Sequence, residues 1–198
     1  MSEAWVVNAS PLILFSRIGR LDSIERLAPT ILVPNAVIEE VRAGQHKDRK
    51  AATALEWAGQ YRVENVTVAA SIEHWDLGSG ESQVISHSVG KDRWTVLDDR
   101  AARRCAGAHG IPVIGSLGVV LRSKKHRHIE RTRPLIEDLI GAGMSWNTLD
   151  PVRSEPVCSS SSRISTRLTC QAAGARSPST FGFDCARRLH HTHWRTTR

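Results

Sequence analysis

Short apolar runs alternate with amphipathic stretches along residues 5–150 of the chain. Runs of apolar and β-branched residues predict buried strands, and apolar positions that recur every three or four residues predict helices. Strands are expected at Trp5–Val7, Ile31–Val33, Arg62–Val68, Trp94–Leu97 and Ile111–Ile114. Helices are expected after each of the first two strands and at Ala51–Ala58, Glu81–Val89, Arg100–Ala108, Leu117–Lys125 and Pro134–Ala142. We expect Ser10 and Asn35 to cap the first two helices, and Gly44 to end the second.

The order of these elements predicts the fold class. Strands that are separated by helices pair in parallel through right-handed crossovers, so we expect an α/β/α three-layer sandwich around a central parallel sheet. The pattern ends near residue 150. Residues 151–198 contain four consecutive serines and no sustained periodicity, which is typical of a segment that cannot bury a core. We therefore predict a domain over 1–150 and a low-complexity basic tail over 151–198.

The net charge of +7 suggests a nucleic-acid binder until it is divided by position. Residues 1–150 contain 19 Lys and Arg against 18 Asp and Glu, whereas the tail contains eight Arg against two acids. The domain therefore lacks a general positive field of the kind that attracts phosphate backbones. The tail is either a disordered arm that touches nucleic acid or an ending that is not native to the protein, and we derive no function from it.

The sequence pattern shows neither a membrane span nor a secretory signal. No apolar run approaches the ~20 residues of a membrane span, and the first residues do not have the pattern of a secretory signal. The domain has Cys105 as its single cysteine, and the three cysteines of the tail have no close-pair zinc spacing. We expect a cytoplasmic protein with reduced thiols and no membrane association.

Polar and acidic residues follow the predicted strands. Asn8 comes directly after the first strand, Asp98 and Asp99 follow the fourth, and Glu40 and Glu81 lie on the apolar sides of two helices. The carboxyl ends of parallel strands meet at one edge of a sheet, where α/β proteins place their sites. Carboxylates that converge there raise one another's pKa values until a divalent cation neutralises them.

Each of these residues also has a purely structural interpretation. Glu81 could favour a helix N-terminus through the dipole, and Asp98 could be an N-cap. Glu40 could be a surface acid, and Asn8 could be a turn residue that supports Ser10. The set at successive strand ends, rather than any single member, indicates a site.

The segment Val6–Ile13 (VVNASPLI), together with Ile18–Leu21, resembles the opening of PIN-domain nucleases, and within them a branch related to VapC-type toxins. The similarity continues through four further segments and covers about residues 4–145. These segments are Val33–Val41, Leu77–Glu81, Leu97–Arg103 and Gly110–Gly118.

The resemblance implies hydrolysis of RNA phosphodiester bonds with the help of Mg²⁺ or Mn²⁺. By position, the four acids of the family correspond to Asn8, Glu40, Glu81 and either Asp98 or Asp99. Ser10 corresponds to a hydroxyl residue that supports the first acid. Asn8 departs from the family, which has Asp there, and an amide keeps an oxygen ligand but removes one negative charge from the metal site.

The family also implies a mechanism and partners. One or two metal ions would activate a water and stabilise charge on the phosphate during in-line attack, with the carboxylates as ligands. The implied role is the toxin of a toxin–antitoxin pair, restrained by a small antitoxin protein and often a homodimer.

The densest basic cluster of the domain lies at the end of the predicted helix Leu117–Lys125. Its cations could guide RNA phosphates toward the acids, or they could be a solvated helix end that complements the dipole. The cluster lacks interleaved aromatic residues, which argues against a base-stacking platform. The residues concerned are Arg122, Lys124, Lys125 and Arg127.

Two other functions compete with the ribonuclease. Because Asn8 weakens the acidic set, the chain could be a PIN-like module that binds RNA or a partner protein without cleavage. A small-ligand α/β domain is the third hypothesis, and it predicts no response to divalent metal.

Overall fold

A computed structural model describes residues 3–45 and 50–144, which form a five-stranded parallel sheet with the order β3-β2-β1-β4-β5. Every neighbouring pair is parallel, with Trp5 opposite Ile31 on one side and Trp94 on the other. The strands are β1 (Ala4–Val7), β2 (Thr30–Pro34), β3 (Arg62–Val63), β4 (Arg93–Val96) and β5 (Val113–Ile114). This topology confirms the predicted three-layer class.

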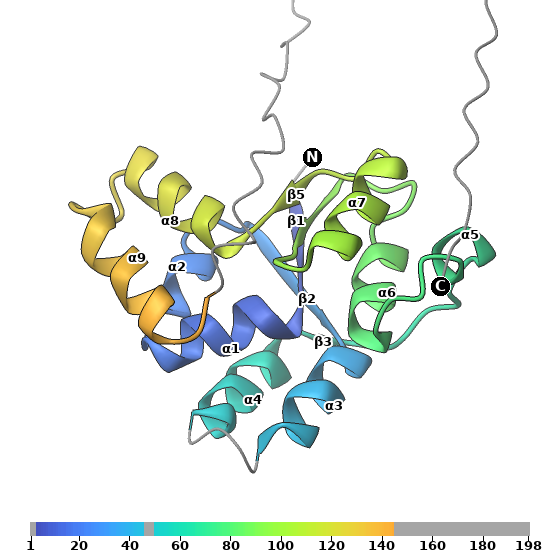
Figure 1. The fold of residues 1–198 in the computed structure, drawn as a ribbon, viewed down its shortest axis with the longest axis horizontal. Coiled ribbons are helices and arrows are strands. Elements are labelled where there is room, and N and C mark those ends of the chain that lie inside the picture. Colours follow the sequence, from blue (N-terminus) through green and yellow to red (C-terminus); the bar gives the residue numbers. More distant parts are fainter. Residues whose placement is uncertain (1–2, 46–49, 145–198) are drawn as a thin grey trace, which may run out of the picture. The chain divides into compact units, whose positions relative to one another are not determined.

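Helices cover both faces of this sheet (Figure 1). Helix α8 contacts α1 and α2 in one layer, α6 and α7 pack together in the other, and α3 contacts α1, α4 and α6. The helices are α1 (Ala9–Arg17), α2 (Asp22–Glu25), α3 (Asn35–Ala43), α4 (Ala51–Gln60), α5 (Ala70–Glu73), α6 (Ser79–Ser86), α7 (Arg100–Ala108), α8 (Ser116–Lys125) and α9 (Thr132–Gly141). No helix in these described ranges is long and apolar enough to cross a membrane.

The core is centred on β1, where Trp5, Val6 and Val7 are fully buried. A parallel strand with helices on both faces is apolar at successive positions rather than at alternate ones, and the run of three large apolar residues has this pattern. Further buried side chains come from both helix layers, among them Leu12, Phe15, Ile24, Ile85, Ala102 and Val119. The long-range packing therefore holds the ends of β1 and β4 in fixed positions.

The chain enters its first two strand-following helices earlier than predicted, so both predicted N-caps were wrong. Helix α1 begins at Ala9 with Asn8 as its N-cap residue, and Ser10 is its second residue. Helix α3 begins at Asn35 itself, after Pro34. The predicted end of α3 at Gly44 is confirmed. Both strand-to-helix turns are tight, because Asn8 alone separates β1 from α1 and no residue separates β2 from α3.

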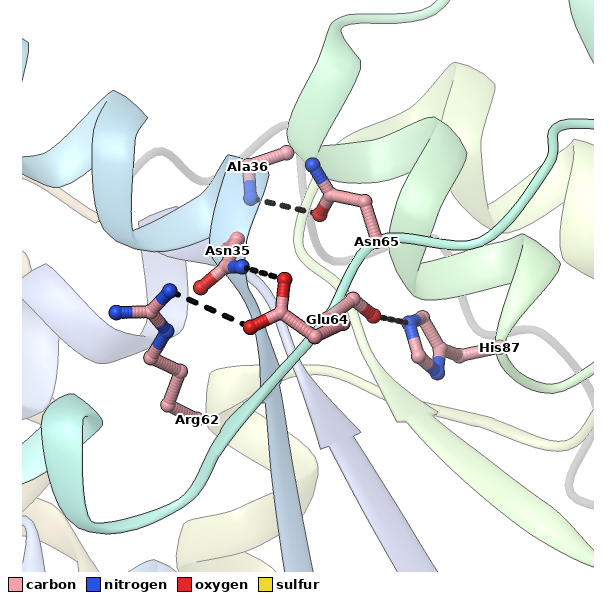
Figure 2. A network of polar contacts seen from close by, with 6 residues as sticks. All are labelled: Asn35, Ala36, Arg62, Glu64, Asn65 and His87. Carbon is pink, nitrogen blue, oxygen red and sulfur yellow. Dashed lines mark hydrogen bonds and ion pairs between the residues drawn. The ribbon is translucent and has the colours of Figure 1, made fainter.

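The predicted strand Arg62–Val68 was too long, because β3 ends at Val63 and residues 64–69 run as an irregular segment. Side chains hold this 64–69 segment in place of a strand ladder. Gln83 bonds both the N–H (2.8 Å) and the C=O (2.7 Å) of Val66. Other contacts join the segment to α3 and α6, as Figure 2 shows: Asn35 with Glu64 (2.7 Å), Ala36 with Asn65 (3.0 Å) and His87 with the Glu64 carbonyl (3.0 Å).

Helices α2 and α5 were not predicted, since four residues are too few to show a helical period. The predicted basic tail lies outside the described residues, and the domain boundary at residue 150 stays a prediction.

Candidate active site

The predicted site residues lie at the carboxyl edge of the sheet. Asn8 follows β1 directly, and its backbone N–H donates to the Val96 carbonyl at 3.2 Å. Asp98 lies two residues beyond β4, the strand paired with β1. Helices α3 and α6, which pack against each other, carry Glu40 and Glu81. The fold therefore brings residues from four separate segments to the same part of the molecule.

Gly80 is the point at which two of these side chains meet. A Cβ on Gly80 would clash with Oε2 of Glu40 and lie 3.2 Å from Oδ1 of Asn8. Only a residue without a side chain allows the backbone of α6 to approach this pair of oxygens so closely. The glycine thus allows an amide oxygen and a carboxylate oxygen to converge.

Asn8 is fully buried, and neither Oδ1 nor Nδ2 has a hydrogen-bond partner within the described part of the chain. Leaving a buried polar group unpaired costs about 1–3 kcal/mol. Buried side-chain amides are nearly always paired, so an unpaired one calls for a further partner such as an ion or a water. Its placement against Glu40 makes this amide the most informative feature of the site.

The charges of Glu40 and Glu81 act on each other. Burial of its carboxyl group and the negative charge of Glu81 raise the pKa of Glu40, although much of that residue is exposed. Glu81 also accepts a hydrogen bond from the Gly78 N–H at 2.8 Å, at the start of α6. Glu81 therefore lies in the first turn of a helix, where its structural interpretation expected it, and its charge also acts on Glu40.

The structure separates the roles of the two adjacent aspartates. Asp99 is exposed and is the N-cap of α7, where it accepts from the Ala102 N–H at 2.8 Å. Asp98 is buried and accepts two hydrogen bonds from Ser116, at 2.8 Å from the N–H and 2.5 Å from the hydroxyl. Burial raises the pKa of Asp98, while the Ser116 bonds and the charge of Arg103 oppose that rise.

Three residues around Asp98 were missed by sequence reasoning. Ser116 begins α8, so Asp98 lies at the positive end of that helix. A Cβ on Gly115 would lie 3.0 Å from Oδ1 of Asp98 and 2.5 Å from Nη1 of Arg103, which itself donates to the Leu97 carbonyl at 3.3 Å. The Gly-Ser pair before an apolar helix was a visible N-terminus signal, but it did not indicate which acid it would bind.

The ligand atoms of these residues are of the chemical type that a hard divalent cation prefers. All of its ligand atoms are oxygens, which Mg²⁺ and Mn²⁺ prefer, and the unpaired Oδ1 of Asn8 lies beside the destabilised carboxylate of Glu40. In ranges 3–45 and 50–144, no three acidic, His or Cys side chains are close enough to hold an ion. The oxygens form two groups, one around Gly80 and the other where Ser116 binds Asp98.

Two sets of predicted residues lie apart from these groups. Ser10 is exposed in the first turn of α1, and its supporting role stays a prediction. The basic cluster is at the far end of α8 from Asp98, and Arg122 packs on Trp94 near the start of β4. Its role in binding RNA also stays a prediction, but it does not lie beside the acids.

Comparisons with known proteins found a matching family and a similar solved structure. The sequence matches a family described as PIN domain over residues 4–148. A crystal structure of VapBC2 from Rickettsia felis, bound to a DNA fragment from their promoter, is similar with a TM-score of 0.41 and 12% identity. That match covers 57% of this chain and 98% of the other. No curated protein matches the sequence.

PIN domains are generally nucleases, and they typically use divalent metals. The parallel sheet and the oxygen-rich carboxyl edge accord with the sequence match, which spans well over half of the chain. The chain therefore belongs to the PIN-domain family.

Proposed function

We propose that this protein is a divalent-metal-dependent ribonuclease and the toxin of a toxin–antitoxin pair. The observation that carries the proposal is the buried amide of Asn8, unpaired in the described chain and placed against the carboxylate of Glu40. Glu81 lies close enough to raise the pKa of Glu40, and Asp98 lies at the same edge of the sheet. Such a set of oxygens is costly without a cation.

Asn8, Glu40, Glu81 and Asp98 would hold the metal ion. When bound, it would lower the pKa of a water and stabilise charge on the phosphate oxygens. Glu81 contributes negative charge while its bond to Gly78 fixes its position. Ser116 fixes both oxygens of Asp98.

RNA is the proposed substrate, with a small antitoxin and a second copy of the chain as proposed partners. These proposals rest on the resemblance of the sequence to the VapC-type branch of the PIN-domain family.

Cleavage of a mixed RNA pool by the full chain, in Mn²⁺ and in EDTA, tests the proposal. Glu40→Gln should remove the metal-dependent cleavage, because it deletes the charge that faces Asn8. Glu81→Gln should do the same while retaining an oxygen that can accept from the Gly78 N–H. Glu39→Gln, an exposed neighbour on α3, is the matched control and should cleave normally. Equal cleavage by all four proteins would contradict the proposal.

A second candidate is a binding module that holds RNA or a partner without cleavage. The neutral amide at position 8 favours it, since one negative charge of the family's acidic set is missing. Metal-dependent cleavage by the unmodified chain would exclude this candidate. A Mn²⁺-induced rise in melting temperature without cleavage would favour it, since a ligand that binds the native state stabilises it.

A further inference from the structure

Two tryptophans are stacked near the amino-terminal edge of the sheet, opposite to the acids. Trp5 and Trp94 are neighbours in the register of β1 and β4, and their ring centroids are 6.4 Å apart at an interplanar angle of 26°. Trp5 is buried, whereas Trp94 is half-buried. The indole N–H of Trp5 has no hydrogen-bond partner among the described residues. This pair forms a rigid aromatic base beneath the end of α8.

Arg122 lies over this aromatic base. Its guanidinium carbon is 4.0 Å from the centroid of the Trp94 ring and 5.8 Å from that of Trp5. The first of these distances is that of close stacking, and it lies well inside the range of cation–π contacts. A guanidinium that stacks on a ring can offer its other face to a second planar group. The structure thus places a cation close to two stacked aromatic rings.

The surrounding segment concentrates the positive charge of the domain. Residues 122–133 contain six Lys and Arg against one acid, which leaves 13 Lys and Arg against 17 acids in the rest of 1–150. Lys124, Lys125 and Arg127 are exposed. Arg127 has a positive φ of 61°, so the chain turns sharply here and does not extend the helix. One or two cations are enough to complement a helix dipole, so the six cations of residues 122–133 are more than the end of α8 requires.

We propose that this edge is a second binding surface for single-stranded RNA, separate from the acids. One base stacks on the outer face of the Arg122 guanidinium, and Lys124, Lys125 and Arg127 contact phosphates. Unstacked bases of RNA are commonly recognised on guanidinium planes of this kind. The sequence lacks aromatic residues within the basic cluster, but the fold supplies them from β1 and β4. Trp94 therefore supplies a ring that the basic cluster itself does not contain.

The position of Arg122 over the two tryptophans indicates how this RNA-binding surface would cooperate with the acids. Trp94 precedes Asp98 by four residues, or about 13 Å of extended strand. Helix α8 joins the two places, with Ser116 on Asp98 at one end and Arg122 on Trp94 at the other. A strand held at this RNA-binding surface would be retained near the acids. The choice of RNA as the ligand rests on the proposed function.

Fluorescence anisotropy with a 5′-labelled single-stranded RNA tests the proposal on the full chain in EDTA, so that cleavage does not interfere. Arg122→Lys keeps the charge but removes the plane, and we expect about a tenfold rise in Kd, within the range for loss of one stacked base. Arg104→Lys is the matched control. Arg104 lies on α7, and its guanidinium carbon is 6.0 Å from the centroid of the Trp75 ring. An unchanged Kd for Arg122→Lys, or an equal loss in the control, would overturn the proposal.

A second measurement does not depend on how Arg122→Lys folds. Replacing the exposed Lys125 and Arg127 by Gln should reduce the slope of log Kd against log salt by about 1.4, since each phosphate contact on a single strand contributes about 0.7. An unchanged slope would also overturn the proposal. Glu40→Gln separates the two functions: it should abolish cleavage and leave Kd unchanged. If the unmodified chain binds RNA through Arg122 but never cleaves it, the nuclease proposal alone fails.

Discussion

Replacing Asn8 by Asp puts a negative charge into the most crowded part of the candidate active site. Oδ1 of Asn8 lies 3.2 Å from the position of a Cβ on Gly80, and Oε2 of Glu40 lies nearer still, so the two oxygens are at most about 6 Å apart. At an effective dielectric constant of about 20, two unit charges at this distance repel by about 3 kcal/mol. The side chain is fully buried, and desolvation adds to this cost.

We therefore expect Asn8→Asp to lower the free energy of unfolding in EDTA at pH 7 by about 3 kcal/mol, or the melting temperature by roughly 10 °C. A cation that relieves this repulsion should bind about 100-fold more tightly to the variant, since 1.4 kcal/mol corresponds to a factor of ten. Thermal melts at increasing Mn²⁺ measure both effects. The variant should be the less stable protein in EDTA and show the larger Mn²⁺-induced rise in melting temperature.

The pH dependence of the same variant has a definite sign. The folded-state pKa of Glu40 is already raised, and a second carboxylate should raise it further. A raised carboxyl pKa gives stability that is present below the unfolded value of about 4.3 and is lost as pH rises. The variant and the unmodified chain should therefore converge in stability near pH 4 and diverge above it.

Gln60→Glu, which adds the same charge at an exposed position of α4, is the control for net charge. It should change stability by no more than a few tenths of a kcal/mol. If Asn8→Asp behaves like this control in EDTA and in Mn²⁺, the oxygens around Gly80 do not form a cation site and the reasoning is wrong.

Three other changes give further tests. Ser116→Ala removes a hydrogen bond from the hydroxyl to the buried Asp98 and should lower the free energy of unfolding by about 1–3 kcal/mol at pH 7. Because the change raises the pKa of Asp98 further, urea melts should show no such difference in stability below about pH 4. Gly80→Ala places a methyl group against the Glu40 carboxylate and should abolish the Mn²⁺-induced rise in melting temperature. Gly59→Ala is the control, because there is open space around its Cβ position. It should preserve that rise and stabilise α4 by about 0.5–1 kcal/mol. Burial lowers the pKa of His87, so the stability that its neutral imidazole provides is present above about pH 6.5 and is lost as pH falls. His87→Gln should therefore make the free energy of unfolding less dependent on pH below about 6.5, and an unchanged pH dependence would contradict the reasoning.

The sheet and its acidic edge could be predicted because they depend on local patterns. The apolar run at Trp5–Val7 and the polar residue after it specify a buried strand and its end without any knowledge of the neighbours. The same holds for Asp98 and Asp99 as a pair. Their separate roles depend on Ser116, which lies 18 residues away from Asp98. Two adjacent aspartates at a strand end are locally equivalent, and tertiary contacts alone distinguish them.

The errors have the same origin. The predicted strand over Arg62–Val68 has suitable residues, but its backbone groups at Val66 bond to the Gln83 side chain rather than to a neighbouring strand. The stacking of Arg122 on Trp94 joins residues that are 28 positions apart, so inspection of the basic cluster alone missed it. Sequence periodicity predicts elements, whereas these features depend on which side chains the folded elements bring together.

The 64–69 segment has a consequence for how the two acid-bearing helices tolerate mutation. It is bonded to the first residues of α3 and to Gln83 and His87 of the α6 region, so it braces one helix against the other from outside the site. The separation of Glu40 and Glu81 thus depends on amide and imidazole contacts that lie within about two helical turns of the acids. Drift at these outlying polar positions would alter the geometry of the acids while leaving every acid in place, so that a chain could keep all of its site residues and still change in activity.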